Sequence, residues 1–469
     1  MTPAELVALV CCDLGSIVRG RSVLASELDE HVRAGIGWVP ANNALTPLGP
    51  VADPNPFGST GDLRLLPDLD TRTVLAADDN GHSRLELILC DIVELNGRPW
   101  ECCPRSFLRN ALGALEQELG AYVRASFEHE FQLLANAAPI PPERPPELPT
   151  ARPGPPALAD RPPTLADRPP ALPFTLDAQR RVEPFPEEVM GALLEAGVQP
   201  ERFFAEYAPR QFEIPLAASD GLTSADRSVL ARIVVAEVAR RRGLRASFVP
   251  LLDPEQAGNG VHIHLSLVDA DGAPLLYDAE RPGCLSELGS SFAAGILAHA
   301  RALSALSAAS PVSGARLQPH RWSAGAVCLA QQNREALLRI PPLVEIGGTD
   351  PAGQLHLEYR AADAAANPYL ALGAIVRAGL EGVRARLAPP PLLECDPAEL
   401  DAEQTERFGV GALPSTLEEA LSALAADDTV RGWMTPLLYD AYRCVKRAEL
   451  DAAAGVDLQE LCRRYAHIY

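Results

Sequence analysis

The stretch Gly258-Asn-Gly-Val-His-Ile-His-Leu-Ser-Leu267 places a glycine-rich loop directly before an alternating run of apolar and polar residues. Side chains two residues apart on a strand point to the same face of a sheet. A strand here therefore carries His262, His264 and Ser266 on one face and anchors itself through the apolar residues on the other. Two histidines on a half-exposed strand without a site would show the same pattern, so other stretches must decide between the two interpretations.

Two other apolar-flanked stretches show the same arrangement of paired polar side chains. Phe127-Glu-His-Glu-Phe131 places Glu128 and Glu130 on one face of a strand. Leu357-Glu-Tyr-Arg360 places an acid and a base, Glu358 and Arg360, on one face. Three strands of this kind predict the wall of a single polar cavity.

Further acids lie in an extended, apolar-rich stretch, residues 203–214. Mg²⁺ and Mn²⁺ prefer oxygen ligands with an occasional imidazole. Five carboxylates near one another would repel strongly unless cations neutralised them. The sequence therefore predicts a divalent metal site built from five acids and one imidazole: Glu128, Glu130, Glu206, Glu213, His262 and Glu358.

Four arginines supply the complementary charge. A guanidinium pairs bidentately with both phosphate and carboxylate groups. Metal ions and arginines around a transferable phosphate make phosphoryl transfer the natural reaction class. The arginines concerned are Arg316, Arg334, Arg339 and Arg360.

The composition limits the class of protein. A chain of 469 residues can bury a large core and can hold more than one domain. Its 47% hydrophobic and 22% charged residues are typical of a soluble globular protein. The net charge of −21 argues against a nucleic-acid or anionic-membrane partner. Solubility alone explains this charge, although acids gathered around metal ions would add to it.

The sequence also predicts a cytoplasmic location. No run of about 18 apolar residues exists that would span a bilayer. The first residues are acidic before they are hydrophobic, unlike a secretory signal. Ten cysteines without framework spacing are typical of reduced cytosolic thiols.

Composition shifts divide the chain into a small β-rich region, residues 1–100, and a larger region, residues 101–469. The first region contains a predicted hairpin at 7–23, a helix at 26–34 and a long loop at 38–60. Residues 137–175 are rich in proline, which breaks helices and sheet ladders, so we expect a surface insertion there. Later predicted elements are helices at 107–119, 187–196, 227–242 and 286–308, strands at 73–77, 85–90, 246–250 and 333–341, and a capping box at 415–418.

Characteristic stretches occur along nearly the whole chain, among them Asp13-Leu-Gly-Ser16, Phe127-Glu-His-Glu-Phe131, Gly260-Val-His-Ile-His-Leu-Ser266, Gln332-Asn-Arg334 and Asn367-Pro-Tyr-Leu370. In these stretches, and in their order, the sequence resembles the glutamine synthetase family. The resemblance implies an α+β fold with an N-terminal β-grasp domain at 1–100. It implies a catalytic domain at 101–469, in which helices surround an antiparallel sheet.

The resemblance also implies an activity and an assembly. ATP would phosphorylate the γ-carboxylate of glutamate, and an amine would then attack the resulting acyl phosphate. Two or three Mg²⁺ or Mn²⁺ ions would serve each active site. The subunits would form a homo-oligomeric ring, a hexamer or a double-hexamer dodecamer, with active sites shared between neighbours.

Residue roles are likewise implied by the resemblance. Glu130, Glu206 and Glu213 match the ligands of one metal ion, and Glu128, His262 and Glu358 match those of a second. His264, Ser266 and Arg339 match the nucleotide side. Gly258 and His262 border the glutamate site. Arg316 and Arg360 match groups that hold the substrate carboxylates, and Arg334 and Arg339 match groups that stabilise the moving phosphate.

Departures from the family pattern concern the amine. Trp322 stands where ammonia-using members carry a flap glutamate, and an indole cannot take a proton. Trp38-Val-Pro-Ala-Asn-Asn43 replaces the family's Asp-Gly-Ser-Ser element, whose aspartate helps to bind ammonium. Both changes affect the ammonium site and leave the metal ligands intact. They predict a bulkier amine that brings its own apolar contacts, with Trp322 among the substrate-binding residues.

Other departures leave alternatives open. Leu251-Leu252 replaces a Lys-Pro pair, Ala257 an asparagine, and His356 an arginine near the nucleotide. These changes are compatible with a catalytically weak paralogue that has a regulatory or binding role. Glutamine synthetase proper, using ammonia, and a ligase whose acid is not glutamate are further alternatives.

Overall fold

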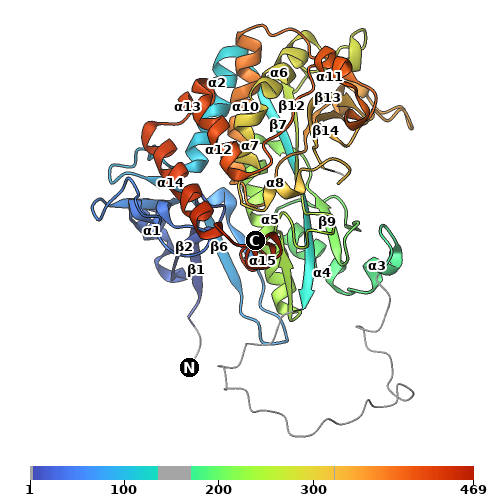
Figure 1. Cartoon of the computed structure of the whole chain (residues 1–469). Helices are drawn as coiled ribbons and strands as arrows, with labels where there is room; N and C mark the ends of the chain where they lie inside the picture. Colours follow the sequence, from blue (N-terminus) through green and yellow to red (C-terminus); the bar gives the residue numbers. More distant parts are fainter. Residues whose placement is uncertain (1–3, 136–170, 322) are drawn as a thin grey trace, which may run out of the picture.

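The computed structural model describes residues 4–135, 171–321 and 323–469 (Figure 1). The chain forms helices and two sheets whose strands pair mostly antiparallel, so the α+β class is confirmed. Most of the proline-rich insertion and the side chain of Trp322 lie outside these described residues.

The first sheet is formed within residues 6–93, drawn in blue in Figure 1. Its strand order is β2-β1-β6-β4-β3, with β5 paired to β6, and β1 runs parallel to β6. The predicted hairpin is present as β1 and β2, whereas the identification of this sheet as a β-grasp stays a prediction. The elements are β1 Leu6–Cys12, β2 Val18–Leu24, α1 Leu28–Ala34, β3 Ile36–Trp38, β4 Leu63–Pro67, β5 Thr73–Leu75 and β6 Leu85–Val93.

The second sheet carries ten strands in the order β16-β13-β14-β15-β12-β7-β9-β8, with β10 and β11 also paired to β7. Its central strands are antiparallel, as predicted. The predicted antiparallel pairing does not extend to the outer strands, because β13 runs parallel to both β14 and β16. The strands are β7 Tyr122–Ala135, β8 Phe204–Ala205, β9 Gln211–Pro215, β10 Ser219–Asp220, β11 Leu244–Ser247, β12 Val261–Val268, β13 Ala326–Gln331, β14 Ala336–Ile340, β15 Leu357–Tyr359 and β16 Leu392–Leu393.

Strand β7 organises this sheet. It pairs with β9, β10, β11 and β12, all of which follow it in the chain. Its apolar residues alternate with polar ones: Phe127 and Phe131 are buried, while Glu128 and Glu130 lie on the other face. Phe131 packs at ring-centroid distances of 5.4 Å from Phe248 and 6.2 Å from Phe212. The apolar face thereby fixes the orientation of the acidic face.

Helices cover the sheets, with α6, α7, α10 and α12 packed beside one another (Figure 1). The long helices are α2 Pro104–Leu119, α4 Phe185–Glu195, α5 Gly221–Arg241, α6 Glu287–Ala298, α10 Pro368–Arg384, α12 Leu417–Ala426 and α14 Pro436–Ala453. The shorter helices are α3 Leu176–Arg180, α7 Ala300–Ser307, α8 Ser313–Arg316, α9 Pro351–Gln354, α11 Ala402–Phe408, α13 Asp428–Gly432 and α15 Leu458–Tyr465.

Three helix predictions are corrected by capping and hydrogen bonding. Helix α5 begins at Gly221 rather than 227, because the Asp220 carboxylate accepts a hydrogen bond from the Thr223 amide at 3.0 Å. The helix predicted over 286–308 is two helices separated at His299, whose backbone is non-helical. The cap of α12 is Thr416, one residue later than predicted, since its hydroxyl accepts from the Glu419 amide.

A buried arginine on α2 joins the two sheets' regions. Arg105 donates to both carboxylate oxygens of Asp226 on α5, at 2.9 and 2.8 Å. It also contacts Asp68, directly after β4, and Asp91, within β6, at 2.6 and 3.2 Å. Tyr369 donates to Asp226 at 2.6 Å from α10. We call Arg105, Asp68, Asp91, Asp226 and Tyr369 the arginine clamp.

Within the described ranges, no helix combines the length and the apolar character needed to cross a bilayer.

Candidate active site

Strand register gathers the predicted polar residues on one face of the second sheet. Glu130 of β7 lies opposite Glu213 of β9, and Glu128 lies opposite His262 of β12. On the other side of β12, His264 lies opposite Glu358 of β15, which lies opposite Arg339 of β14. Opposite residues on neighbouring strands have Cβ atoms about 4.5–5.5 Å apart, so the register alone brings these groups together.

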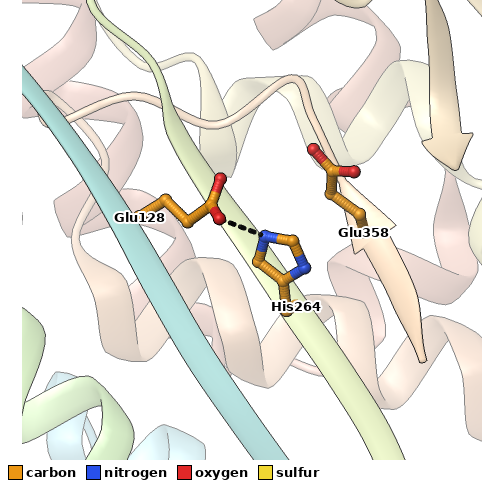
Figure 2. Close-up of side chains that lie close together, drawn as sticks. All are labelled: Glu128, His264 and Glu358. Carbon is orange, nitrogen blue, oxygen red and sulfur yellow. Dashed lines mark ion pairs between the residues drawn. The ribbon is translucent and has the colours of Figure 1, made fainter. Parts of the chain in front are cut away.

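The two histidines of β12 contact the acids on both sides. His262 Nδ1 lies 3.2 Å from Glu128 Oε2 and 3.8 Å from Glu358 Oε1, and its Nε2 lies 3.7 Å from Glu130 Oε1. His264 Nε2 lies 3.3 Å from Glu128 Oε1. Figure 2 shows His264 between Glu128 and Glu358, with the contact to Glu128 dashed. Each imidazole therefore lies between carboxylates from neighbouring strands.

Two arginines compensate the charge of Glu358, which is buried. Arg339 donates to Glu358 Oε2 at 2.6 Å, and Arg360 donates to its other oxygen. Burial alone would raise the pKa of Glu358, but Arg360, the two histidines and Arg339 lower that pKa to about 2. Arg334 lies in the cavity wall near Arg360, whose Nε donates to the Arg334 carbonyl at 2.9 Å.

Two other acids lack such compensation. Burial raises the pKa of Glu206 to about 8, and the negative charge of Glu130 adds to this shift. Burial, together with repulsion from Glu128 and Glu130, raises the pKa of Glu213 well above its ordinary value. A bound cation would neutralise these carboxylates and so remove the repulsion between them. These residues therefore fit a metal site through both their chemistry and their uncompensated charge.

Two groups of side chains are close enough to share an ion. Ligand atoms of Glu128, Glu213 and His262 lie within 4.8 Å of one another, as do those of Glu128, His264 and Glu358. The predicted division was different: it placed His264 with the nucleotide and grouped Glu130 and Glu206 with Glu213. Here Glu128 belongs to both groups, and His264 is grouped with Glu358, although His262 Nδ1 also lies 3.8 Å from Glu358 Oε1.

Most predicted site residues line one cavity of about 540 Å³. They are Glu128, Glu130, Glu206, Glu213, Gly258, His262, His264, Arg334, Arg339 and Arg360. Ser266 instead lines a smaller neighbouring cavity of about 240 Å³, which shares Glu128, His264 and His356 with the first. Glu358 lies behind the wall, bound to the two arginines described above.

The glycine loop lies over Arg316, which is buried and does not line the cavity. A Cβ atom on Gly258 would come within 2.3 Å of the Pro250 carbonyl oxygen and 2.7 Å of Arg316 Cγ. The loop thus packs closely against Arg316, whose Nη2 donates to the Ala362 carbonyl at 2.8 Å. The Gly260 amide donates to Glu130 Oε2 at 3.0 Å, which ties the loop to the acidic wall.

Gln211 is a positioning residue that the sequence analysis did not single out. Its amide nitrogen donates to Gly258 O at 2.8 Å, Asn259 Oδ1 at 2.9 Å and Glu130 Oε2 at 3.1 Å. The stretch Gln211-Phe-Glu213 carried the signal, because Gln211 lies two residues before Glu213 and so shares its strand face.

The structure describes some, but not all, of the residues that differ from the family pattern at the expected ammonium site. Trp322 lies outside the described residues. Trp38 and Asn43 are buried, and the Asn43 side chain donates to the Cys102 carbonyl at 3.2 Å. Neither lines the cavity of this chain.

The three departures near the nucleotide and glycine loop differ in their placement. Leu251 belongs to the core. Ala257 and His356 line the cavity. Burial, and then the charge of His264, lowers the pKa of His356.

Sequence reasoning missed several lining residues, among them Phe174, Arg202, Tyr207 and Arg321. Tyr207 directly follows a predicted ligand, and Arg321 directly precedes Trp322. These adjacencies were the available signals. Phe174 and Arg202 lie in stretches with the composition of ordinary loops and without a recognisable motif. Their position at the cavity is therefore a result of the fold and could not be predicted from the local sequence.

Comparisons with known proteins address the whole chain. The sequence model of the glutamine synthetase catalytic domain matches residues 101–463, and that of the glutamine synthetase N-terminal domain matches residues 1–100. A gamma-glutamylpolyamine synthetase of Streptomyces coelicolor is 33% identical over 472 residues, covering 99% of this chain and 93% of that protein. A glutamine synthetase of Methanocaldococcus jannaschii is 31% identical, covering 83% of this chain and 80% of that protein.

A solved structure supports the same relationship. A crystal structure titled as a glutamine synthase homologue superposes with a TM-score of 0.86 at 42% sequence identity. It covers 100% of this chain, and this chain covers 99% of it. Both family models, the relatives and the folded architecture agree with the geometry of the acid-lined cavity. The chain therefore belongs to the glutamine synthetase family of ATP-dependent carbon–nitrogen ligases.

Proposed function

We propose that this protein joins the γ-carboxylate of glutamate to an amine other than ammonia. The proposal rests on a contrast between two parts of the site. The predicted metal ligands and the phosphate-facing arginines gather at one cavity. At the positions where the family binds ammonium, by contrast, this chain carries different residues, Trp322 and Trp38–Asn43. The Streptomyces coelicolor relative is named for a glutamate–polyamine product, which supports an amine substrate larger than ammonia.

We propose Glu130, Glu206 and Glu213 as ligands of one divalent ion, and Glu128, His262 and Glu358 as ligands of a second. The raised pKa values of Glu206 and Glu213 support this, because burial and the neighbouring carboxylates destabilise the charged form of each, and at Glu206 they outweigh the opposing effect of Arg334. His264 is close enough to Glu128 and Glu358 to share the second ion. When bound, Mg²⁺ or Mn²⁺ supplies Lewis-acid polarisation and neutralises phosphate charge. The number of ions per site, two or three, is part of this proposal.

The two chemical steps would proceed as follows. An oxygen of the glutamate γ-carboxylate attacks the γ-phosphorus of ATP, and ADP leaves. The amine nitrogen then attacks the γ-carbonyl carbon, phosphate leaves, and the nitrogen loses a proton. Arg334 and Arg339 would stabilise charge on the transferred phosphoryl group, as guanidinium groups do.

The other residues would position the substrates. Arg360, and Arg316 beneath the glycine loop, would hold glutamate carboxylates, with Gly258 and His262 bordering that site. Ser266 and His264 line the smaller cavity next to the phosphate-facing residues, which supports placing the nucleotide there. Exclusion of water from this site protects the acyl phosphate from hydrolysis.

Assembly and location are also proposals. We propose a homo-oligomeric ring, a hexamer or dodecamer, on the strength of family membership. We propose a cytoplasmic location, supported by ten cysteines that are all free, seven of them buried.

The test is ADP release by the purified protein with ATP, Mg²⁺ and glutamate, across ammonia, methylamine, longer alkylamines, ethanolamine and polyamines. We expect turnover with at least one amine to exceed turnover with ammonia. Glu130→Ala and Glu213→Ala should abolish turnover while leaving the circular dichroism spectrum unchanged. Undiminished activity in both folded variants, or absence of ADP release with every amine and with ammonia, would overturn the proposal.

A further inference from the structure

The mouth of the cavity carries an aromatic pair. Phe174 and Tyr207 lie edge-to-face with ring centroids 5.0 Å apart, and both line the 540 Å³ cavity. Their side chains are 53% and 41% exposed, which is high for large aromatic residues. Aromatic side chains together with a few polar groups are the usual lining of small-molecule sites.

The backbone of Phe174 supports a binding role. Its φ is +57°, in the left-handed region that a bulky residue rarely adopts. Such conformations persist where the surrounding structure enforces them, and they cluster at ligand-binding positions. The strained backbone therefore holds the ring at the cavity mouth, against Tyr207.

The charges that this chain contributes to the cavity wall disfavour a second ammonium group. Among the described lining residues, every carboxylate belongs to the proposed metal ligands: Glu128, Glu130, Glu206 and Glu213. The other ionisable groups in the described lining are the imidazoles of histidines, the guanidinium groups of arginines and the Tyr207 phenol. Arg321 and Arg202, which pairs with Glu201 at 3.0 Å, line the same cavity, so the described part of this chain offers a second cationic group guanidinium groups but no acid beyond the proposed metal ligands.

Apolar side chains also line the same cavity. Phe204, Pro215, Pro341 and Pro342 line the cavity together with the aromatic pair. Burial of an apolar tail against such groups is favourable at about 25 cal/mol per Å² of apolar surface removed from water. An aliphatic or aromatic tail on the amine would therefore gain contacts that a hydrated ammonium would lose.

We propose that the amine substrate is a monoamine with an apolar tail, and that Phe174 and Tyr207 hold that tail at the cavity mouth. The inference rests on the proposed function, because it assigns the substrate class of the same site. It separates this protein from a polyamine ligase, in which a distal ammonium would need an acid partner.

The experiment compares n-pentylamine with 1,4-diaminobutane, which have the same number of non-hydrogen atoms and differ in the distal charge. With the full-length protein, ATP, Mg²⁺ and glutamate, kcat/KM for n-pentylamine should exceed that for 1,4-diaminobutane by about tenfold or more, the scale of one apolar contact in a pocket. Equal or greater use of 1,4-diaminobutane would overturn the inference while leaving the ligase function intact. Absence of turnover with every amine, methylamine included, would instead overturn the proposed function.

Three variants test the residues. Phe174→Ala and Tyr207→Ala should lower kcat/KM for n-pentylamine about tenfold and change that for methylamine much less, because methylamine has no tail to contact the rings. Leu194→Ala is the matched control, since Leu194 is 54% exposed but lies on α4 away from the cavity, and it should leave both values unchanged. Equal losses with both amines in the aromatic variants would show a general structural role and would contradict the assignment.

Discussion

Glu213 shows how one residue combines a structural cost with a chemical role. It lies opposite Glu130 on the neighbouring strand, and its carboxyl is buried among other acids. Without a cation these groups repel, so the folded protein holds them at a loss of stability. A ligand that binds only the folded state stabilises it by mass action, by about 2.7 kcal/mol at a hundredfold excess over Kd.

We therefore expect Mg²⁺ or Mn²⁺ to raise the Tm of the metal-free protein. Glu213→Gln should reduce this shift, since it removes one charge from the ligand set and relieves part of the repulsion without the metal. Differential scanning fluorimetry with and without added metal measures both effects. Glu94→Gln, an exposed residue paired with Arg98 in the first sheet's region, is the control and should retain the full shift. An equal shift in Glu213→Gln would contradict the ligand assignment.

Trp322 is a second single residue whose role can be tested, although it lies outside the described residues. Its indole cannot accept a proton from an ammonium ion, whereas a glutamate can. We expect Trp322→Glu to raise kcat/KM for ammonia relative to that for an alkylamine. Amine competition assays measure the ratio directly, and an unchanged ratio would count against a role for Trp322 in amine choice.

At the scale of elements, helices α6 and α10 approach each other through glycines. A Cβ atom on Gly382 would lie 2.1 Å from the Ser291 carbonyl oxygen, and one on Gly295 would lie 2.1 Å from the Ala378 carbonyl oxygen. Backbone atoms of the partner helix occupy these positions, so a methyl group cannot be accommodated by rotating a side chain. The two helices must separate to admit it.

Gly382→Ala should therefore destabilise the protein by about 1–3 kcal/mol, the usual range for overpacking a core. Gly113→Ala on α2 is a matched control, because no atom lies within 4 Å of its Cβ position. In a helix interior that change should stabilise by up to about 1 kcal/mol. Urea unfolding of both variants measures the difference, and a neutral Gly382→Ala would contradict the close approach of the helices.

Most central elements could be predicted from the sequence, because their patterns are local. The alternation in residues 127–131 and 261–267 specifies both the strands and the face that carries the acids. The outer strands β13 and β16 could not be predicted, since β16 is two residues long and exists only through pairing with β13. Which acids share an ion depends on register between strands far apart in sequence, and no local pattern contains that register.

At the scale of the whole molecule, the arginine clamp joins the first sheet's region to the helices over the second sheet. Arg105 is 3% exposed and serves three aspartates from both regions. Removing one partner of a buried ion pair leaves uncompensated charge and typically costs about 3–5 kcal/mol. The clamp thus couples the stability of the two regions.

We expect Arg105→Leu to destabilise the protein by roughly that 3–5 kcal/mol and to split unfolding into two transitions, because the shared contact is lost. Arg98→Leu removes an exposed ion pair with Glu94 and should change stability by less than about 1 kcal/mol. Denaturant unfolding followed by fluorescence and circular dichroism measures both. A single transition at the wild-type midpoint would show that the clamp does not couple the regions.

The position of β7 in the chain has a consequence for biosynthesis. All four of its partner strands follow it, and residues 136–210 separate its end from β9. At translation rates of about 5–20 residues per second, the nascent strand waits several seconds before a partner emerges from the ribosome. During that wait, Glu128 and Glu130 interrupt an otherwise apolar run, and charged residues within such runs oppose aggregation. The carboxylates proposed for catalysis would thus also protect the newly made chain.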